Sequence, residues 1–303
     1  MTTSKKFIGT GTALITPFHA DGSLDLQALE QLVDQQIRNN INYLVVLGTT
    51  GESATVRADE RALIKETVRR ANNGRVPLVL GIGGNDTYAV RDAMLQEDLD
   101  GFDAILSVAP YYNKPNQRGM VEHYRILAEH APRPLIIYNV PGRTGANMLA
   151  QTQLEIAGFD NVIGTKEASG NVEQCMEILR HKPEDFLVIS GDDALTFPFL
   201  ALGMDGVISV ATHAFPHAMS RMVSEALRGN WTEARSLHYA LLPVMQEIFA
   251  DGSPGGIKVM LETAGICKNV VRLPLMPVKE EVAIRLRTLY RQLAEDERLS
   301  GQS

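Results

Sequence analysis

Leu135-Ile136-Ile137-Tyr138-Asn139-Val140 and, further along, Val162-Ile163-Gly164-Thr165-Lys166 are two short, largely apolar runs that decide the fold. Continuous apolar runs of this length are typical of strands buried on both faces, as in a parallel sheet wrapped by helices. Similar runs occur elsewhere in the chain, at residues 8–17, 43–47, 76–82, 104–109, 186–190 and 206–211. The sequence therefore predicts eight strands.

Longer segments between these runs carry apolar residues at every third or fourth position, which is the spacing of amphipathic helices. They lie at residues 26–39, 58–72, 87–99, 119–130 and 172–181. Strand and helix alternate, so the predicted fold is an α/β (β/α)₈ TIM barrel. An open doubly wound sheet is the alternative, and it is weakened because Gly9-Thr10-Gly11 lacks the third glycine of a dinucleotide-binding turn.

The alternation stops near Leu227, where Gly229-Asn230 interrupts the pattern. Helical spacing then continues without strands, at residues 231–249, 256–264 and 278–293. A segment this long is not expected to be a loop. We therefore predict a catalytic barrel at residues 1–228 and a small helical C-terminal domain at residues 229–303.

Composition excludes several classes of partner. The 303 residues contain 29 Lys and Arg against 36 Asp and Glu, a net charge of −7, so nucleic acid is not expected to bind. No run of apolar residues is long enough to span a bilayer, so no membrane association is expected. The two cysteines, Cys175 and Cys267, lie far apart and suit a reducing compartment, so we expect a cytoplasmic protein.

In a (β/α)₈ barrel the reactive groups lie at the carboxyl ends of the strands. Lys166 is the only one of nine lysines that lies in an apolar strand-like run. Loss of hydration there should lower its pKa and make a neutral amine available to form a Schiff base with a carbonyl. The alternative is a lysine that reaches water at the barrel mouth and pairs with Glu167 or Asp192.

Other polar groups at neighbouring strand ends fit a keto acid. Tyr138 lies on the strand before Lys166 and could transfer protons, although a tyrosine that merely packs its ring remains open. Thr49 and Thr50 lie in a glycine-bounded turn that could hold a carboxylate, or could instead cap the next segment. Arg143 offers a fork of donors for a second carboxylate, unless it is an exposed loop arginine.

No metal or organic cofactor is expected. His213 and His217 are separated by four positions with Pro216 between them, and no third ligand is placed nearby. Asp192-Asp193 could be paired catalytic carboxylates or metal ligands, but a cap on the next helix is the preferred interpretation.

Four motifs at strand ends carry a family resemblance, which extends from Gly11 to Arg272-Leu273-Pro274-Leu275. They are Gly48-Thr49-Thr50-Gly51-Glu52-Ser53, Pro110-Tyr111-Tyr112-Asn113, Tyr138-Asn139-Val140-Pro141-Gly142-Arg143-Thr144-Gly145 and Gly164-Thr165-Lys166-Glu167-Ala168. The chain strongly resembles the dihydrodipicolinate synthase family, within the N-acetylneuraminate lyase superfamily. Ser253-Pro254-Gly255-Gly256-Ile257-Lys258 departs from the more usual Pro-rich sequence of that family.

The resemblance implies a lyase that condenses pyruvate with L-aspartate 4-semialdehyde to 4-hydroxy-tetrahydrodipicolinate, in the diaminopimelate route to lysine. Lys166 would form the Schiff base and Tyr138 would donate and accept the protons. Thr49 would link Tyr138 to Tyr112 of a neighbouring subunit, in a homotetramer built as a dimer of dimers.

The substrate-binding residues are implied in the same way. Thr50, Gly191 and the backbone at Ile208 would hold pyruvate, and Arg143 would bind the carboxylate of the semialdehyde. Arg143 favours the synthase over a 2-keto-3-deoxy acid or sialic acid aldolase of the same superfamily. A non-catalytic barrel that binds small acids is the remaining alternative.

Many members of the family are inhibited by lysine. At the positions that the resemblance assigns to the effector, this chain has Ala58, Arg61, Asp86 and Ala89, and retains Asn85 and Tyr111. Ala89 removes the carboxylate that would pair with the ammonium of the effector. We therefore expect weak or absent feedback by lysine.

Overall fold

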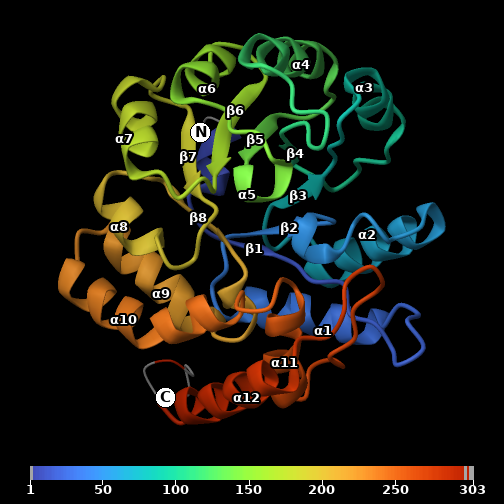
Figure 1. Cartoon of the computed structure of the whole chain (residues 1–303), viewed down its shortest axis with the longest axis vertical. Coiled ribbons are helices and arrows are strands. Elements are labelled where there is room, and N and C mark those ends of the chain that lie inside the picture. Colours follow the sequence, from blue (N-terminus) through green and yellow to red (C-terminus); the bar gives the residue numbers. More distant parts are fainter. Residues whose placement is uncertain (1–2, 297–298, 300–303) are drawn as a thin grey trace.

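Eight parallel strands close into a barrel in the computed structural model, which describes residues 3–296 and 299 (Figure 1). The strands follow one another around the barrel in chain order, and β8 pairs with β1 to close it. They are β1 (Gly9–Ala13), β2 (Tyr43–Val46), β3 (Leu78–Gly81), β4 (Ala104–Val108), β5 (Leu135–Asn139), β6 (Val162–Glu167), β7 (Leu187–Ser190) and β8 (Gly206–Ser209). The predicted TIM barrel is thus confirmed.

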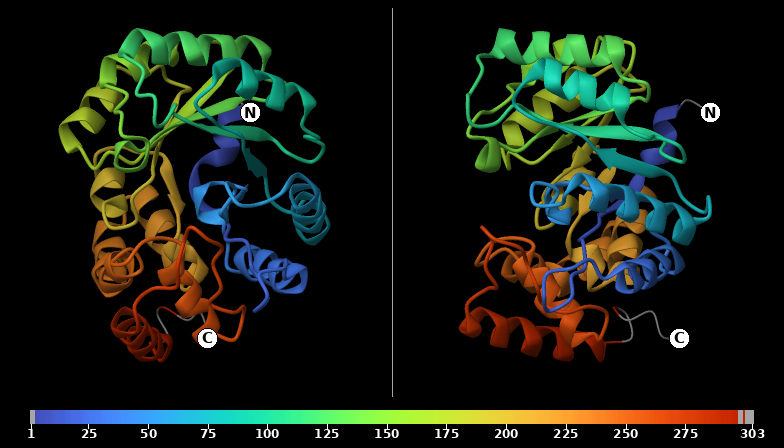
Figure 2. Two further views of the ribbon diagram at one scale, coloured as in Figure 1. Left: turned by 45° about the vertical axis from the view of Figure 1, so that its right-hand side comes forward. Right: turned by 90° about the vertical axis from the view of Figure 1, so that its right-hand side faces the viewer.

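Helices surround the barrel, as the views in Figures 1 and 2 show. Those that follow the strands are α1 (Leu26–Arg38), α2 (Ala58–Asn72), α3 (Thr87–Gln96), α4 (Gln117–His130), α5 (Pro141–Thr144), α6 (Ala150–Ile156), α7 (Val172–His181), α8 (Thr196–Ala201) and α9 (Pro216–Leu227). Short 3-10 turns lie at η1 (Thr3–Phe7), η2 (Thr49–Gly51) and η3 (Ala211–His213).

Side-chain caps fix where several of these helices begin. Asp25 accepts a hydrogen bond from the N–H of Ala28 before α1, and Asn171 accepts one from Gln174 before α7. Each cap satisfies a backbone donor that has no partner within the helix. α7 begins at the residue that the sequence predicts, directly after its Asn171 cap.

Alternating strand residues separate two apolar cores. One fills the barrel and includes Tyr43, Val79 and Ile136, and the other lies between the strands and the helices and includes Leu44, Leu80 and Ile137. Neighbouring residues of a strand point to opposite faces, so each residue of the site is assigned either to the barrel interior or to the helix layer.

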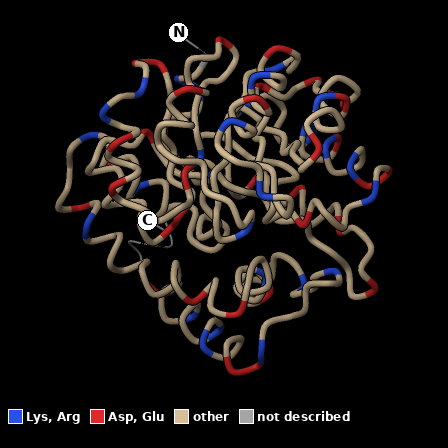
Figure 3. Tube along the Cα trace, turned by 45° about the horizontal axis from the view of Figure 1, so that its top comes forward, with Lys and Arg blue, Asp and Glu red and all other residues tan. Residues whose placement is uncertain are grey.

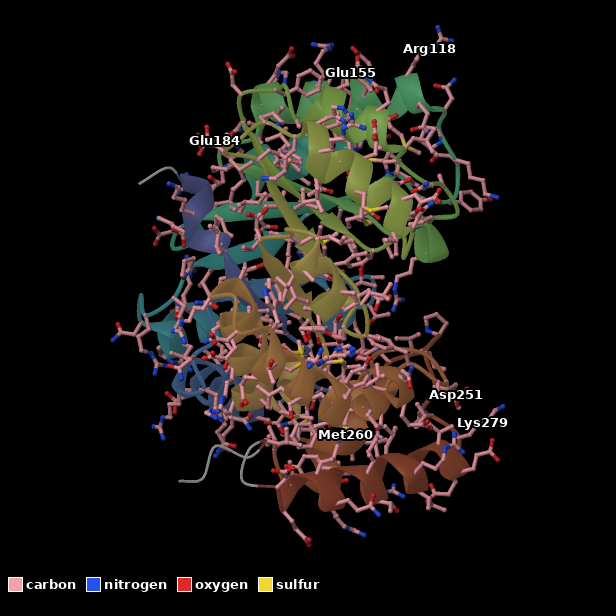
Figure 4. All side chains as sticks on the ribbon, turned by 90° about the vertical axis from the view of Figure 1, so that its left-hand side faces the viewer. Arg118, Glu155, Glu184, Asp251, Met260 and Lys279 are labelled. Carbon is pink, nitrogen blue, oxygen red and sulfur yellow. The ribbon has the colours of Figure 1, made fainter. Side chains whose placement is uncertain are left out.

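The chain after β8 and α9 is helical, with α10 (Trp231–Glu247), α11 (Gly255–Thr263) and α12 (Glu280–Ala294). α10 packs on α9, and α12 packs on α10 and α11, on the side of the barrel away from α4 and α6 (Figures 1 and 2). Figure 4 shows Asp251 beside Lys279 at one end of α12, where the Lys279 N–H donates to Asp251 Oδ2 at 2.7 Å. The division at residue 228 stays a prediction.

Lys and Arg positions alternate with Asp and Glu positions over much of the Cα trace (Figure 3). None of the helices within residues 3–296 combines the length and the apolar character needed to cross a bilayer.

Candidate active site

Lys166 and Tyr138 are cross-strand neighbours inside the barrel. β5 and β6 pair in parallel with Tyr138 opposite Lys166, near the carboxyl ends of both strands. The Lys166 Nζ lies 4.4 Å from the centroid of the Tyr138 ring. The sequence prediction that the two side chains are spatial neighbours is therefore confirmed.

Lys166 is a buried amine without a counter-ion. Its side chain is 6% exposed, and within residues 3–296 no hydrogen bond or ion pair engages its Nζ. Burial lowers the pKa of Lys166 to about 8, while the negative charge of Asp193 opposes this shift and the positive charge of Arg143 adds to it. At pH 7 about a tenth of the amine is therefore neutral, and about half is neutral near pH 8.

The alternative reading of Lys166 as a surface lysine paired with Glu167 or Asp192 is wrong. Glu167 points away from the barrel interior and is fully buried in the helix layer, bound by Asn139, Gln153 and Gln174. Asp192 Oδ1 instead accepts a hydrogen bond from the N–H of Leu195 at 3.1 Å.

Tyr138 is a neutral phenol at the wall of the same cavity. Burial raises its pKa to about 12, and the nearby charge of Arg143 acts in the opposite direction. The side chain is 7% exposed. A protonated phenol beside a neutral amine can donate a proton to an oxygen that leaves as water.

The turn after β2 presents Thr49 and Thr50. It lies between two residues with left-handed backbone, Leu47 at φ 56° and Glu52 at φ 54°, which side chains of these types adopt at an energetic cost. The Thr16 hydroxyl fixes the turn by donating to the Gly51 carbonyl at 2.6 Å. Neither threonine hydroxyl caps a helix, so the capping alternative for this pair is wrong.

One cavity of about 440 Å³ brings most of the predicted site together. Its lining includes seven of the eight predicted site residues: Lys166, Tyr138, Thr49, Thr50, Arg143, Gly191 and Ile208. A second cavity of about 570 Å³ adjoins it, and Thr49, Tyr138 and Arg143 line both.

Tyr112 is the eighth residue and stays outside this cavity. Its side chain is 86% exposed, and its backbone is left-handed at φ 73°. Within one copy of the chain, Tyr112 therefore does not reach the surroundings of Lys166.

Asp193 is a site residue whose position the sequence did not reveal. Its Oδ2 accepts hydrogen bonds from the N–H groups of Val210 and Ala211 at 3.0 and 2.9 Å, which anchors the chain just after β8. Burial raises its pKa, and it lines the cavity with Lys166. The predicted cap on the next helix is wrong for both aspartates. Asp192 binds the Leu195 N–H in the turn before α8, whose start has no side-chain cap, and the carboxylate of Asp193 turns toward β8.

α10 and the segment that follows it also contribute to the cavity, through Met245, Gln246, Phe249 and Ser253. Nothing local in the sequence marks these positions, because they adjoin the barrel mouth only after the chain has folded. They close one side of the space above Lys166.

His213 has a structural position. Its Nε2 accepts a hydrogen bond from the Ile15 N–H at 3.1 Å, and its Nδ1 lies 2.8 Å from the Val210 carbonyl oxygen. The part of the chain that the structure describes holds no cluster of three His, Cys, Asp or Glu residues arranged for a metal. The chemistry that the site offers is that of an amine, a phenol and donors for carboxylates.

Comparisons with known proteins agree with this arrangement. The model of the dihydrodipicolinate synthetase family matches residues 6–293. 4-Hydroxy-tetrahydrodipicolinate synthase of Flavobacterium psychrophilum is 49% identical over 290 residues, covering 95% of this chain and 99% of that protein.

Solved structures give the same result. Dihydrodipicolinate synthase from Thermotoga maritima superposes with a TM-score of 0.93 at 38% identity, covering 95% of this chain and 99% of that one. The enzyme from Acinetobacter baumannii, solved in complex with pyruvate, gives a TM-score of 0.91 at 34% identity, covering 95% and 99%. The chain belongs to the dihydrodipicolinate synthetase family.

Proposed function

We propose that the chain condenses pyruvate with L-aspartate 4-semialdehyde through a Schiff base on Lys166, giving 4-hydroxy-tetrahydrodipicolinate. The observation that carries the proposal is the buried, unpaired Lys166 amine beside the Tyr138 phenol, in a cavity that Thr49, Thr50 and Arg143 also line. Relatives that carry this activity in their names cover nearly the whole chain.

The first half of the reaction activates pyruvate. The neutral Nζ of Lys166 forms a bond to the keto carbon and gives up one of its two protons, which Tyr138 passes to the keto oxygen. That oxygen takes up a second proton and leaves as water, so that a protonated imine forms. Loss of a proton from the methyl group of the protonated imine then gives a neutral enamine. Thr50, Gly191 and the backbone at Ile208 hold the carboxylate of pyruvate.

The second half forms the carbon–carbon bond. The enamine carbon attacks the aldehyde carbon of the semialdehyde, whose carboxylate is bound by Arg143, and the aldehyde oxygen takes up a proton to become a hydroxyl. The amino group of the semialdehyde then attacks the imine carbon and displaces the Lys166 amine, which closes the ring. No metal or organic cofactor takes part in these steps.

A second copy of the chain completes the proposed site. Tyr112 would reach the neighbouring site and exchange protons with Tyr138 through Thr49, in a homotetramer of two dimers. An 86% exposed tyrosine with left-handed backbone supports this, because a large apolar side chain gains stability when a partner covers it. We also propose a cytoplasmic location, which two free cysteines suit.

Reduction with borohydride tests the proposal directly. Incubation of the protein with pyruvate and borohydride should attach the reduced adduct to Lys166, as located by mass spectrometry of peptides, and Lys166→Ala should abolish both attachment and turnover. Product formation from pyruvate should require aspartate semialdehyde. Turnover with a sugar-derived aldehyde instead would support an aldolase, and no attachment to the wild-type protein would contradict the Schiff base itself.

A further inference from the structure

A buried carboxylate lies directly behind the two proposed reactive side chains. Asn139 and Glu167 follow Tyr138 and Lys166 in β5 and β6 and are themselves opposite each other in the strand pairing. Because neighbouring strand residues point to opposite faces, Tyr138 and Lys166 face the cavity while Asn139 and Glu167 face the helix layer. Both of these polar side chains are 0% exposed.

Glu167 binds together several segments around β5 and β6. Three side-chain amides donate hydrogen bonds to Glu167 Oε2. They are Asn139 Nδ2 at 3.0 Å, Gln153 Nε2 of α6 at 2.6 Å and Gln174 Nε2 of α7 at 3.2 Å. The Ser169 N–H donates to Oε1 at 2.7 Å. No lysine, arginine or histidine within residues 3–296 forms an ion pair with it, so the carboxylate depends on these donors.

The same network reaches the segment that carries Arg143. Asn139 Oδ1 accepts a hydrogen bond from the Met148 N–H at 3.0 Å, and Asn139 Nδ2 donates to Asn147 Oδ1 at 2.8 Å. These bonds attach the loop after α5 to the end of β5. Asn139 therefore connects Glu167 to the segment that positions Arg143.

The pairing of β5 and β6 is irregular at its other end. Leu135 is opposite Val162, but Ile136 is opposite Gly164, so the register shifts by one residue between these positions. A shift of one residue moves every side chain of a strand to the other face. At the catalytic end it would turn Lys166 into the helix layer, so this end needs a contact that fixes the register.

The reactive pair cannot fix itself, because no hydrogen bond within residues 3–296 holds the Lys166 Nζ or the Tyr138 hydroxyl. We propose that Glu167 is a positioning residue: by binding Asn139, Gln153 and Gln174 on the outer face, it fixes the register that holds Lys166 against Tyr138. This inference rests on the proposed Schiff-base function and adds to it a residue that touches no substrate.

The surroundings of Glu167 require an acceptor rather than an amide. The Asn139 amide is oriented by the Met148 N–H, and the Gln153 amide by the Thr165 hydroxyl, which donates to its Oε1 at 2.8 Å. Both therefore direct an NH₂ group at Glu167. Glu167→Gln would place a donor against donors without changing the size of the side chain, which is costly in a buried network.

The test measures the rate of borohydride trapping of pyruvate. Glu167→Gln is expected to lower the trapping rate at saturating pyruvate by about 100-fold, the scale of a small misplacement of a reacting group. The pyruvate concentration that gives half the maximal rate should stay the same, because Thr50 and Ile208 lie outside β5 and β6. Gly191 donates its N–H to the backbone carbonyl of Glu167 at 2.8 Å, which the substitution leaves in place. A protein that is only destabilised would not combine a lower maximal trapping rate with an unchanged half-saturating pyruvate concentration.

Asn161→Ala is the matched control. The Asn161 amide donates to the Ala131 carbonyl at 2.9 Å, near the amino ends of β5 and β6 and away from Lys166. Loss of this hydrogen bond should lower the melting temperature and leave the trapping rate unchanged. If Glu167→Gln does not fold, Gln174→Leu removes one donor to the same carboxylate and should give a smaller decrease of the same kind.

The outcomes separate the two proposals. A folded Glu167→Gln or Gln174→Leu protein that traps pyruvate at the wild-type rate would overturn the positioning role. If the wild-type protein is not trapped at all, the Schiff-base function fails instead.

Discussion

Three lysines are buried in the described part of the chain, and only one of them lacks a partner. Lys65 pairs with Glu97, and Lys258 pairs with Glu52 at 2.5 Å. Lys166 has neither a carboxylate nor a carbonyl oxygen within hydrogen-bond distance. Burial alone therefore does not mark a reactive amine, and the absence of a counter-ion distinguishes Lys166 from the other two.

Two charges near Lys166 should shift the pH dependence of imine formation in opposite directions. With the pKa of Lys166 at about 8, the trapping rate should rise through about pH 8 as the amine loses its proton. The negative charge of Asp193 favours the ammonium, so Asp193→Asn should move the midpoint to lower pH. Arg143 disfavours the ammonium, so Arg143→Gln should move it to higher pH.

The measurement is the rate of borohydride trapping with pyruvate alone between pH 6 and 10, about two units on each side of the midpoint. Asp192→Asn is the control, because Asp192 lines the same cavity but is not among the charges that shift Lys166. Unshifted midpoints in both Asp193→Asn and Arg143→Gln would show that Lys166 does not set the pH dependence.

At the scale of elements, sequence spacing predicts the long helices well and the short ones poorly. α2 and α7 have enough turns for an apolar period to show, and their predicted bounds match the structure. α5, α6 and α8 are too short for such a period to show, and no bounds were predicted for them. The first strand ends at Ala13 rather than Pro17, because the backbone leaves the sheet although its residues stay apolar and buried.

The starts of α2 and α3 support the expected insensitivity to lysine. Asp86 caps α3 by accepting hydrogen bonds from Tyr88 and Ala89, so its carboxylate is already engaged. Ala58 and Ala89 supply no charge, and Arg61 pairs with Glu97 at 3.3 Å. Millimolar lysine should therefore leave the steady-state rate unchanged, whereas Ala89→Glu, at an exposed position, should introduce inhibition. Inhibition of the wild type by lysine at millimolar or lower concentration would contradict this expectation.

At the scale of the whole molecule, the C-terminal helices are attached to the turn that carries Thr49 and Thr50. Glu52, directly after this turn, binds Lys258 of α11 through Oε1 and the Arg272 N–H through Oε2. Arg272 also forms an ion pair with Glu60 of α2 at 2.6 Å. The centroid of the Phe18 ring lies 4.4 Å from Lys258 Nζ and 4.2 Å from Arg272 Cζ.

The sequence alone could not predict this attachment. Lys258 Nζ and Glu52 Oε1 meet across 206 positions of sequence, and no local pattern in either segment indicates the other as its partner. By contrast, seven of the eight site residues that strand-end positions and the family resemblance predicted, Lys166 among them, line one cavity, because a barrel brings all carboxyl ends to one face. Contacts that the topology dictates could be predicted, and contacts between the barrel and the C-terminal helices could not.

A double substitution tests whether the attachment depends on charge or on packing. Lys258→Met leaves the Glu52 carboxylate buried and unpaired, and should lower the free energy of unfolding by about 3 to 5 kcal/mol and slow the trapping of pyruvate. Adding Glu52→Gln removes the charge but keeps an acceptor for the Arg272 N–H, so Glu52→Gln with Lys258→Met should recover most of the lost stability. Denaturant unfolding measures the stability, and borohydride trapping measures the rate. If the double variant is no more stable than Lys258→Met alone, the lysine stabilises this contact by packing rather than by neutralising Glu52.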